Sequence, residues 1–287
     1  MKYIIYEFNP LSKDIVVFVH GGPGYPQGIL YSVFFQTLCK ELNLNKLYTW
    51  EQKWSGGDIS IHKLFMNWSI EVFVDELNLV CQHVKKSMPD CNLILFAHSW
   101  GTIVASYFLE QNKGDIYKYV GISPIINGEI GELYSIKSIS KGSSSLRLKT
   151  ISYLYKCNTK ITNLLYLYLQ RSRIVQPMCK YSPIEFNALL YKINFYISIY
   201  KLWPICRKFI IRKFSYFNDV DTLFIFGKKD NITPPSICDE IELKDQQRLN
   251  IIIIDKCYHR PHLENPKAFV KIVNRFLGNP EQVFEEH

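Results

Sequence analysis

The chain has 287 residues, of which 47% are hydrophobic and 21% charged, enough apolar material for one large α/β domain with an insertion or for two smaller domains. No apolar run reaches the about twenty residues of a membrane-spanning helix, and the opening residues lack the apolar segment and cleavage site of a secretory signal. We therefore expect a cytoplasmic protein with no membrane span.

The eight cysteines are scattered, without a C-x-x-C pair and without the spacing of metal ligands. In a chain of this length that lacks a signal, they indicate reduced thiols. No metal and no organic cofactor is expected.

Strand-like apolar runs alternate with amphipathic helical stretches along most of the chain. The expected strands cover residues 4–8, 14–20, 47–52, 92–97, 117–123, 221–227 and 250–256. The expected helices cover residues 27–43, 69–88, 102–112 and 266–277. Asn265 and Pro266 form an N-terminal signal for the last of them. This alternation predicts a mostly parallel, doubly wound sheet with helices on both faces.

Residues 128–218 depart from this pattern in both charge and periodicity. They hold fifteen lysines and arginines but three acids, although the whole chain has a net charge of only +8. Their aromatic residues recur at helical spacing, which usually marks the buried face of a helix. We expect a helical cap, or lid, inserted into an α/β core formed by residues 1–127 and 219–287. The basic composition is equally compatible with a solvated surface or with AT-rich coding bias.

Ser99 follows the apolar run 92–97 in the sequence FAHSWGT. The pattern G-x-S-x-G describes a sharp strand-to-helix turn that exposes a nucleophilic serine, and here Ala97 replaces its first glycine. Small residues are needed two places before and after the serine because the strand and helix backbones pass close together. Ala97 adds only one methyl group, so we interpret Ser99 as a nucleophile rather than as a serine of an ordinary turn.

The segment HGGPG at residues 20–24 follows the strand 14–20. Three glycines and a proline in five residues favour an unusual backbone path that presents a free N–H group. A serine hydrolase needs two such donors, and we expect them from Gly22 and from Trp100, the residue after the nucleophile. A phosphate-binding loop is the alternative, but neither of its glycine patterns is present.

Asp230 lies in GKKDNITPP, directly after the strand 221–227. A carboxylate at this place would orient a catalytic imidazole and stabilise its cationic form. Asp255 is a rival, but it falls within the last strand rather than beyond it. We favour Asp230, for which an Asx-turn is the alternative role.

Two histidines follow the last strand in DKCYHRPHLENP, and both are candidates for the base. His259 comes first in the loop, whereas His262 is close to the start of the next helix and could be a supporting or capping group. We favour His259. His98 is adjacent to Ser99, but neighbouring residues of a strand point to opposite faces, so we do not expect it to act as the base.

The chain order Ser99, Asp230, His259, with each residue after a strand, is typical of α/β-hydrolases. The sequence resembles one branch of them, the proline iminopeptidase-like enzymes of serine peptidase family S33. The matching segments are HGGPG (20–24), WEQKWSGG (50–57), AHSWGT (97–102), GKKDNITPP (227–235) and HRPHLENP (259–266). The resemblance covers the core but not the cap. It implies an α/β-hydrolase fold, a catalytic triad of Ser99, Asp230 and His259, and an oxyanion hole at Gly22 and Trp100. We also expect the Trp100 side chain to form a wall of the pocket.

The sequence departs from this family at several places besides Ala97. Lys53 and Trp54 stand where the family usually has Arg-Gly, and the short N-terminus leaves room for one strand before HGGPG. Aminopeptidases of the family bind the substrate ammonium with cap carboxylates, and this cap has few. Glu129 and Glu132, where the chain leaves the sheet, remain candidates for substrate binding, as does Tyr25.

The predicted function is a serine hydrolase that cleaves an ester, amide or peptide bond of a small-molecule or short-peptide substrate through an acyl-enzyme. The basic cap suggests an alternative, a thioesterase or esterase whose partner is an anionic acyl carrier. A ligand-sensing receptor on a hydrolase scaffold is an alternative of another class. No nucleic acid is expected as a partner, because the basic segment contains no motif for binding it.

Overall fold

The protein is described by a computed structural model. It describes residues 3–24, 31–55, 68–131, 198, 201–240 and 247–279. Among these residues no helix is long and apolar enough to cross a membrane.

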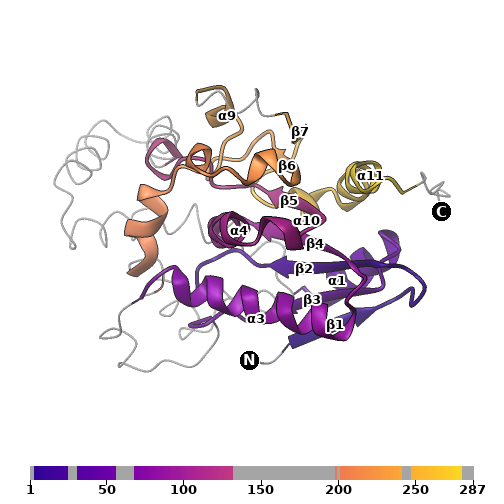
Figure 1. Ribbon diagram of the computed structural model, residues 1–287. Coiled ribbons are helices and arrows are strands. Elements are labelled where there is room, and N and C mark those ends of the chain that lie inside the picture. Colours follow the sequence, from indigo (N-terminus) through magenta and orange to yellow (C-terminus); the bar gives the residue numbers. More distant parts are fainter. Residues whose placement is uncertain are drawn as a thin grey trace, which may run out of the picture.

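Seven strands of the described chain form one sheet in the order β1-β3-β2-β4-β5-β6-β7 (Figure 1). The strands are β1 (Tyr3–Glu7), β2 (Asp14–Val19), β3 (Lys46–Trp50), β4 (Asn92–His98), β5 (Lys118–Ile122), β6 (Asp221–Gly227) and β7 (Leu249–Ile254). Only β1 runs antiparallel to its neighbour, with Tyr3 opposite Trp50. The other pairs are parallel. The mostly parallel sheet and the single strand before the HGGPG strand are as predicted.

Helices cover both faces of the sheet, which confirms the doubly wound architecture. The helices are α1 (Ser32–Glu41), α3 (Glu71–Ser87), α4 (Trp100–Gln111), α9 (Ile237–Glu240), α10 (Pro261–Glu264) and α11 (Pro266–Leu277), with short 3-10 turns at Lys113–Asp115, Ile211–Lys213 and Tyr216–Asn218. The helices α3 and α4 pack on one face, and α1 and α11 pack on the other.

Alternate residues of the central strands supply the two halves of the core. In β2, Val17 and Val19 face α3 and α4, whereas Val16 and Phe18 face α1 and α11. All four are at most 1% exposed, and each contributes about 1.5–3 kcal/mol relative to an exposed position. Because both faces are covered, these strands read as continuous apolar runs in the sequence. The core therefore holds the carboxyl ends of the strands in fixed positions, where ligands of such sheets gather.

Several element boundaries differ from the predictions, and two of these differences lie near the site. Within the helix expected over residues 27–43, the structure describes α1 from Ser32 to Glu41, preceded by Tyr31 with non-helical dihedral angles (φ −109°, ψ 26°); residues 27–30 lie outside the described chain. The strand β4 continues to His98 and the helix α4 begins at Trp100, so Ser99 alone separates them. The junction is tighter than predicted, and it fixes the place of Ser99. Asn265 caps α11 as expected, since its side chain accepts a hydrogen bond from the Ala268 N–H.

The chain leaves the sheet and returns to it along two adjacent segments. Asn127 and Ile210 form an isolated antiparallel bridge, and the N–H of Gly128 donates to the carbonyl of Phe209 at 3.0 Å. A Cβ atom on Gly128 would lie 1.7 Å from the Cys206 carbonyl oxygen, so only glycine fits there. Most of the intervening residues, 132–197, lie outside the described part of the chain.

Candidate active site

Ser99 occupies a strained turn between β4 and α4. Its φ of 51° and ψ of −118° are values that residues with a side chain rarely adopt. Its N–H donates to the carbonyl of Ile122 on β5 at 3.0 Å, which ties the turn to the neighbouring strand. The side chain is therefore presented at the carboxyl edge of the sheet, as the G-x-S-x-G pattern predicts.

The two small residues that flank Ser99 meet different demands. A Cβ atom on Gly101 would lie 2.4 Å from the carbonyl oxygen of Val19, so the helix start cannot accommodate a side chain there. Ala97 is fully buried in the core cluster of α3 and α4, and its partner in the sheet register is Gly121. The ring of Phe224 on β6 fills the place of the missing Gly121 side chain, since a Cβ atom there would lie 2.7 Å from two of its ring carbons.

Ser99, His259 and Asp230 lie in one chain of hydrogen bonds. The Ser99 Oγ is 2.9 Å from the His259 Nε2, and the His259 Nδ1 is 2.8 Å from the Asp230 Oδ2. Asp230 accepts, so Nδ1 carries the proton and Nε2 faces the serine hydroxyl as an acceptor. All three residues are at most 8% exposed. The structure thus brings together the three residues predicted from the sequence.

Asp230 is held in its charged form by its partners. Its Oδ1 accepts from the N–H groups of Ile232 (2.8 Å) and Thr233 (3.0 Å), and its Oδ2 accepts from the Thr233 hydroxyl at 2.7 Å. Burial alone raises the pKa of Asp230, but His259 and the hydrogen bonds from His259 and Thr233 outweigh burial and lower it. The carboxylate therefore remains an acceptor for His259.

The loop that carries His259 is fixed from two sides. The carboxylate of Glu264 on α10 accepts hydrogen bonds from the N–H groups of both neighbours of His259, Tyr258 and Arg260. On the other side, the Nε2 of His98 donates to the His259 carbonyl at 2.9 Å. His98 therefore supports the loop from the opposite face of β4, and its ring contacts the loop rather than the serine hydroxyl.

The two rival residues have other roles. The strand β7 ends at Ile254, so Asp255 lies just beyond it and not within it as predicted. Asp255 is exposed and forms an ion pair with Lys228 at 2.8 Å. His262 is buried beside the rings of Phe34 and His98, with centroid distances of 5.3 and 4.8 Å. Burial, together with the charges of Arg260 and His259, holds the pKa of His262 well below its ordinary value. Neither residue belongs to the hydrogen-bonded chain of Ser99.

The HGGPG loop passes directly beside Ser99. A Cβ atom on Gly21 would lie 3.2 Å from the Ser99 Cβ. Gly22 follows with a φ of 144°, which favours glycine. Trp100 is the first residue of α4, so its N–H has no acceptor within the helix. Within the described residues, neither the Gly22 N–H nor the Trp100 N–H donates to a backbone carbonyl. That these two N–H groups form the oxyanion hole stays a prediction.

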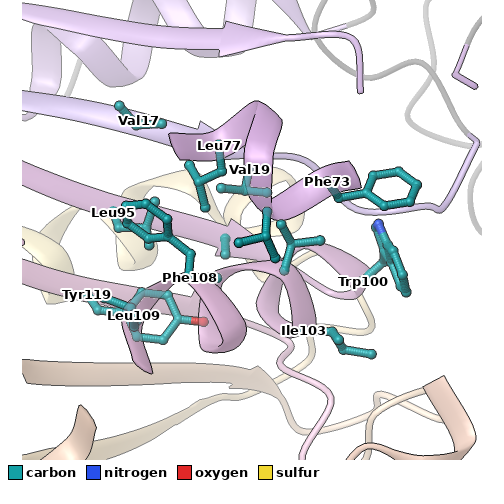
Figure 2. Close-up of a cluster of buried hydrophobic side chains, with 14 of the residues drawn as sticks. Val17, Val19, Phe73, Leu77, Leu95, Trp100, Ile103, Phe108, Leu109 and Tyr119 are labelled. Carbon is teal, nitrogen blue, oxygen red and sulfur yellow. The ribbon is translucent and has the colours of Figure 1, made fainter. Parts of the chain in front are cut away.

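The side chain of Trp100 does not form a pocket wall, so that prediction is wrong. The indole is 0% exposed and packs edge to face against Phe73, with 5.3 Å between ring centroids (Figure 2). Its Nε1 donates to the Gln52 Oε1 at 3.1 Å. An indole at this position completes the core under α4 and finds the polar partner that a buried Trp requires.

Two tryptophans, one after β3 and one just before α3, stack on each other. Trp54, which replaces the usual glycine, has a φ of 67°, a left-handed conformation that costs about 1–2 kcal/mol for a residue with a side chain. Its ring stacks on Trp68 with centroids 4.0 Å apart. The stacked pair offsets the backbone strain.

Of the three residues predicted to bind substrate, only Glu129 is described; Tyr25 and Glu132 lie outside the described residues. Glu129 is exposed and lines a pocket of about 250 Å³ where the chain leaves and re-enters the sheet. The pocket is lined by Asn127, Glu129, Trp203, Pro204, Arg207, Lys208 and Ile210. Within the described chain, no hydrogen bond or ion pair joins Glu129 to Ser99, His259 or Asp230.

Sequence reasoning missed four residues that hold the site: Gln52, His98, Thr233 and Glu264. Thr233 had a local signal, because an aspartate often accepts from the backbone N–H groups that follow it in an Asx-turn. Gln52 and His98 had none, since their partners are distant in sequence.

The residues that the structure describes contain no group of three or more His, Cys, Asp or Glu side chains that could hold a metal ion. The six described cysteines are buried. Burial raises the pKa of the Cys206 thiol to about 12, which keeps it protonated and unreactive.

Comparison with known proteins supports this architecture. A family model described as serine aminopeptidase, S33 matches residues 11–178. A protein of Bacillus subtilis (strain 168) named "Probable aminopeptidase YbaC" is 28% identical, covering 92% of this chain and 89% of its own.

Two solved structures share the fold. The α/β-hydrolase MGS-M2 from a Medee basin deep-sea metagenome library has a TM-score of 0.63 at 17% identity, covering 99% of this chain and 96% of its own. The proline iminopeptidase of Mycobacterium smegmatis has a TM-score of 0.63 at 15% identity, covering 96% and 93%. At these identities the likeness concerns the fold alone. With the match to the family model, it shows that the chain is a hydrolase with the α/β-hydrolase fold and belongs to the S33 serine aminopeptidase family.

Proposed function

We propose that this protein is a serine hydrolase that cleaves an ester, amide or peptide bond of a small substrate through an acyl-enzyme. Ser99 is the nucleophile, His259 the general base and then the general acid, and Asp230 the group that orients the imidazole. The observation that carries the proposal is the chain of hydrogen bonds from the Ser99 Oγ through both ring nitrogens of His259 to Asp230.

The reaction has two halves. His259 takes the proton of Ser99 as Oγ attacks the substrate carbonyl, and the N–H groups of Gly22 and Trp100 stabilise the oxyanion that forms. His259 then protonates the leaving group, and an acyl group remains on Ser99. Water then attacks the acyl carbonyl while His259 takes its proton; as the Ser99 Oγ–acyl bond breaks, His259 returns the proton to Oγ and the acid is released.

For the substrate we favour a small molecule or short peptide with a free amino terminus. The support is the S33 aminopeptidase family and the similar protein named as an aminopeptidase. Glu129 is the described carboxylate nearest the exit of the chain from the sheet, and we assign it to the ammonium group of such a substrate.

We further propose that the segment after Asn127 is a cap over the site that selects the substrate. The support is the paired stem at Asn127 and Ile210 and the burial of Ile211, Tyr216 and Phe217 in the core cluster with α3 and α4. The paired stem ends at Ile210, whereas the charge pattern predicts a cap that extends to residue 218.

A second candidate is an esterase or thioesterase for an anionic or carrier-bound acyl substrate. It is favoured by Arg207 and Lys208, which line the same pocket as Glu129. The two candidates differ in charge: Glu129→Gln should raise KM for a substrate with a free amino group, and Lys208→Gln should raise KM for an anionic one. If neutral and anionic substrates respond equally to added salt, the anionic candidate is excluded.

The test is labelling by a fluorophosphonate probe together with multiple-turnover hydrolysis. The panel contains aminoacyl anilides with free and acetylated amino groups, short-chain esters and acyl thioesters. We expect Ser99→Ala to abolish labelling and to lower kcat by about 10⁴-fold or more, whereas Ser236→Ala, at an exposed serine, leaves both unchanged. Full activity of Ser99→Ala would exclude the mechanism. Labelling of the wild type without multiple turnover would instead favour a ligand-sensing receptor.

A further inference from the structure

His20, the first residue of the HGGPG loop, has a ring that is bound at both nitrogens. Its Nδ1 is 2.7 Å from the carbonyl oxygen of the next residue, Gly21, and its Nε2 is 3.0 Å from the backbone nitrogen of Gln52. The side chain is 1% exposed. Unlike His259, it touches neither Ser99 nor Asp230 through any hydrogen bond of the described residues.

These two partners fix the tautomer of the ring. A carbonyl oxygen only accepts, so Nδ1 must carry the proton; a backbone N–H only donates, so Nε2 must be bare. The carboxylate of Glu51 lies 3.8 Å from Nε2, beyond hydrogen-bond range and farther than Gln52. Burial lowers the pKa of His20 against the opposing effects of Glu51 and the Gly21 carbonyl. The neutral ring with a proton on Nδ1 therefore satisfies both contacts.

The bond to the Gly21 carbonyl also orients the next N–H. The Gly21 carbonyl and the Gly22 N–H belong to the same peptide plane, and in a trans peptide they point in opposite directions. Gly21 itself lies against Ser99, since a Cβ there would be 3.2 Å from the Ser99 Cβ. Glycine at positions 21 and 22 leaves this peptide free to rotate, so some contact must hold it.

We propose that His20 is a positioning residue for the oxyanion hole: by holding the Gly21 carbonyl, its ring aims the Gly22 N–H at the oxygen that becomes negatively charged in the reaction. This inference rests on the proposed serine-hydrolase mechanism. It adds a role for a buried histidine outside the chain of Ser99, His259 and Asp230.

Gln52 links this loop to the second donor. Its Nε2 donates to the His20 carbonyl at 2.7 Å, and its Oε1 accepts from the Trp100 Nε1 at 3.1 Å. Gln52 is 3% exposed. Its side chain thus fixes the spacing between the loop that carries the Gly22 N–H and the residue that carries the other oxyanion N–H. A buried and fully satisfied network of this kind is rigid.

The tautomer can be read in the unaltered protein. We expect the ¹⁵N spectrum of the histidine-labelled protein to show His20 with a protonated Nδ1 and a bare Nε2 at neutral pH, with His20→Asn used to assign the signal. A proton on Nε2 would overturn the proposal, because that tautomer can neither hold the Gly21 carbonyl nor accept from Gln52.

Two variants separate the two ring contacts. The amide nitrogen of His20→Asn lies near the Nδ1 position and can still donate to Gly21, whereas the longer His20→Gln places its amide near Nε2 and cannot. We expect His20→Gln to lower kcat for an ester by about 10²-fold with little change in KM, since loss of an oxyanion donor costs about 10²–10³-fold, and His20→Asn to stay within about tenfold of the wild type.

A thionoester substrate distinguishes a misaimed donor from general damage, because sulfur is a weak hydrogen-bond acceptor. The wild type should prefer ester over thionoester strongly, and His20→Gln should lose most of that preference; an unchanged ratio would overturn the inference. Ser99→Ala separates the two levels of the argument: if that variant remains active, the mechanism itself fails, and if it is inactive while His20→Gln and His20→Asn behave alike, only the role of His20 fails.

Discussion

The candidate site has two halves that are held in place by different physical means. The backbone half, residues 20–24 and 99–101, is fixed mainly by steric fit. Ser99 has strained dihedral angles, Gly101 lies against two carbonyl oxygens, and the buried ring of His20 contacts the Gly21 carbonyl. The side-chain half, residues 230–233 and 259–264, is fixed by carboxylates that accept several hydrogen bonds each. A single methyl group should therefore damage the first half, whereas the second should respond to the loss of a charge or a donor.

The largest effect is expected in the side-chain half, from Asp230→Asn. The change conserves volume but replaces the acceptor of the His259 Nδ1 proton, so the imidazole loses the orientation and charge stabilisation it needs. We expect kcat to fall by about 10⁴-fold, as for removal of the charge from a triad carboxylate. Steady-state kinetics with a short-chain ester measures it. The matched control is Asp255→Asn at the exposed Lys228 pair; equal losses in the two variants would contradict the assignment.

The backbone half should fail through packing when Gly101 becomes alanine. The added Cβ would lie 2.4 Å from the Val19 carbonyl oxygen and 2.8 Å from that of His20, so the start of α4 must move away from β2. We expect a loss of about 1–3 kcal/mol in the free energy of unfolding and a loss of activity, because Ser99 and the Trp100 N–H move with the helix. Urea unfolding measures the first effect.

Gly114→Ala is the control for that substitution, since its Cβ would meet nothing within 4 Å. It should change stability by no more than about 1 kcal/mol, in the stabilising direction if anything. Similar destabilisation of both variants would mean that loss of glycine, and not the contact with β2, is responsible.

A smaller effect is expected from Thr233→Val, which removes one donor to Asp230 and keeps the shape of the side chain. The hydroxyl lies 2.7 Å from the Asp230 Oδ2, and a hydrogen bond to a charged group is worth about 1.5–3 kcal/mol. We expect kcat/KM to fall about tenfold and Thr233→Ser, which keeps the hydroxyl, to restore most of it. A serine variant as impaired as the valine variant would assign the effect to packing.

The two halves also differ in how much of them the sequence predicts. Ser99, Gly22, Asp230 and His259 follow apolar strands, so periodicity and local patterns find them. Some of the residues that hold them are not local: Gln52 contacts His20 and Trp100, and His98 contacts His259. Such contacts depend on which strands become neighbours in the sheet, and a single sequence does not give that order. The pocket-wall role expected for Trp100 failed for the same reason, since packing against Phe73 decides it.

The smallest expected effect concerns acid stability, and His262→Phe tests it. The buried ring of His262 lies among Phe18, Phe34 and Phe269, and its Nδ1 has no hydrogen-bond partner in the described structure. Its pKa is lowered by burial first and by Arg260 and His259 next, so below pH about 6.5 the unfolded chain binds a proton that the folded chain does not. The free energy of unfolding must then decrease as the pH is lowered, by at most about 1.4 kcal/mol per pH unit for this histidine.

In His262→Phe, the free energy of unfolding measured in urea at pH 7.5 should change by about 1 kcal/mol or less. Its decrease between pH 7.5 and 5.5 should be smaller than in the wild type. His98, whose pKa is also held well below its ordinary value by burial, keeps its own share of the acid sensitivity, so the dependence should shrink without disappearing. An unchanged dependence on pH would show that His262 also accepts a proton in the folded protein, which would contradict the lowered pKa of its buried ring.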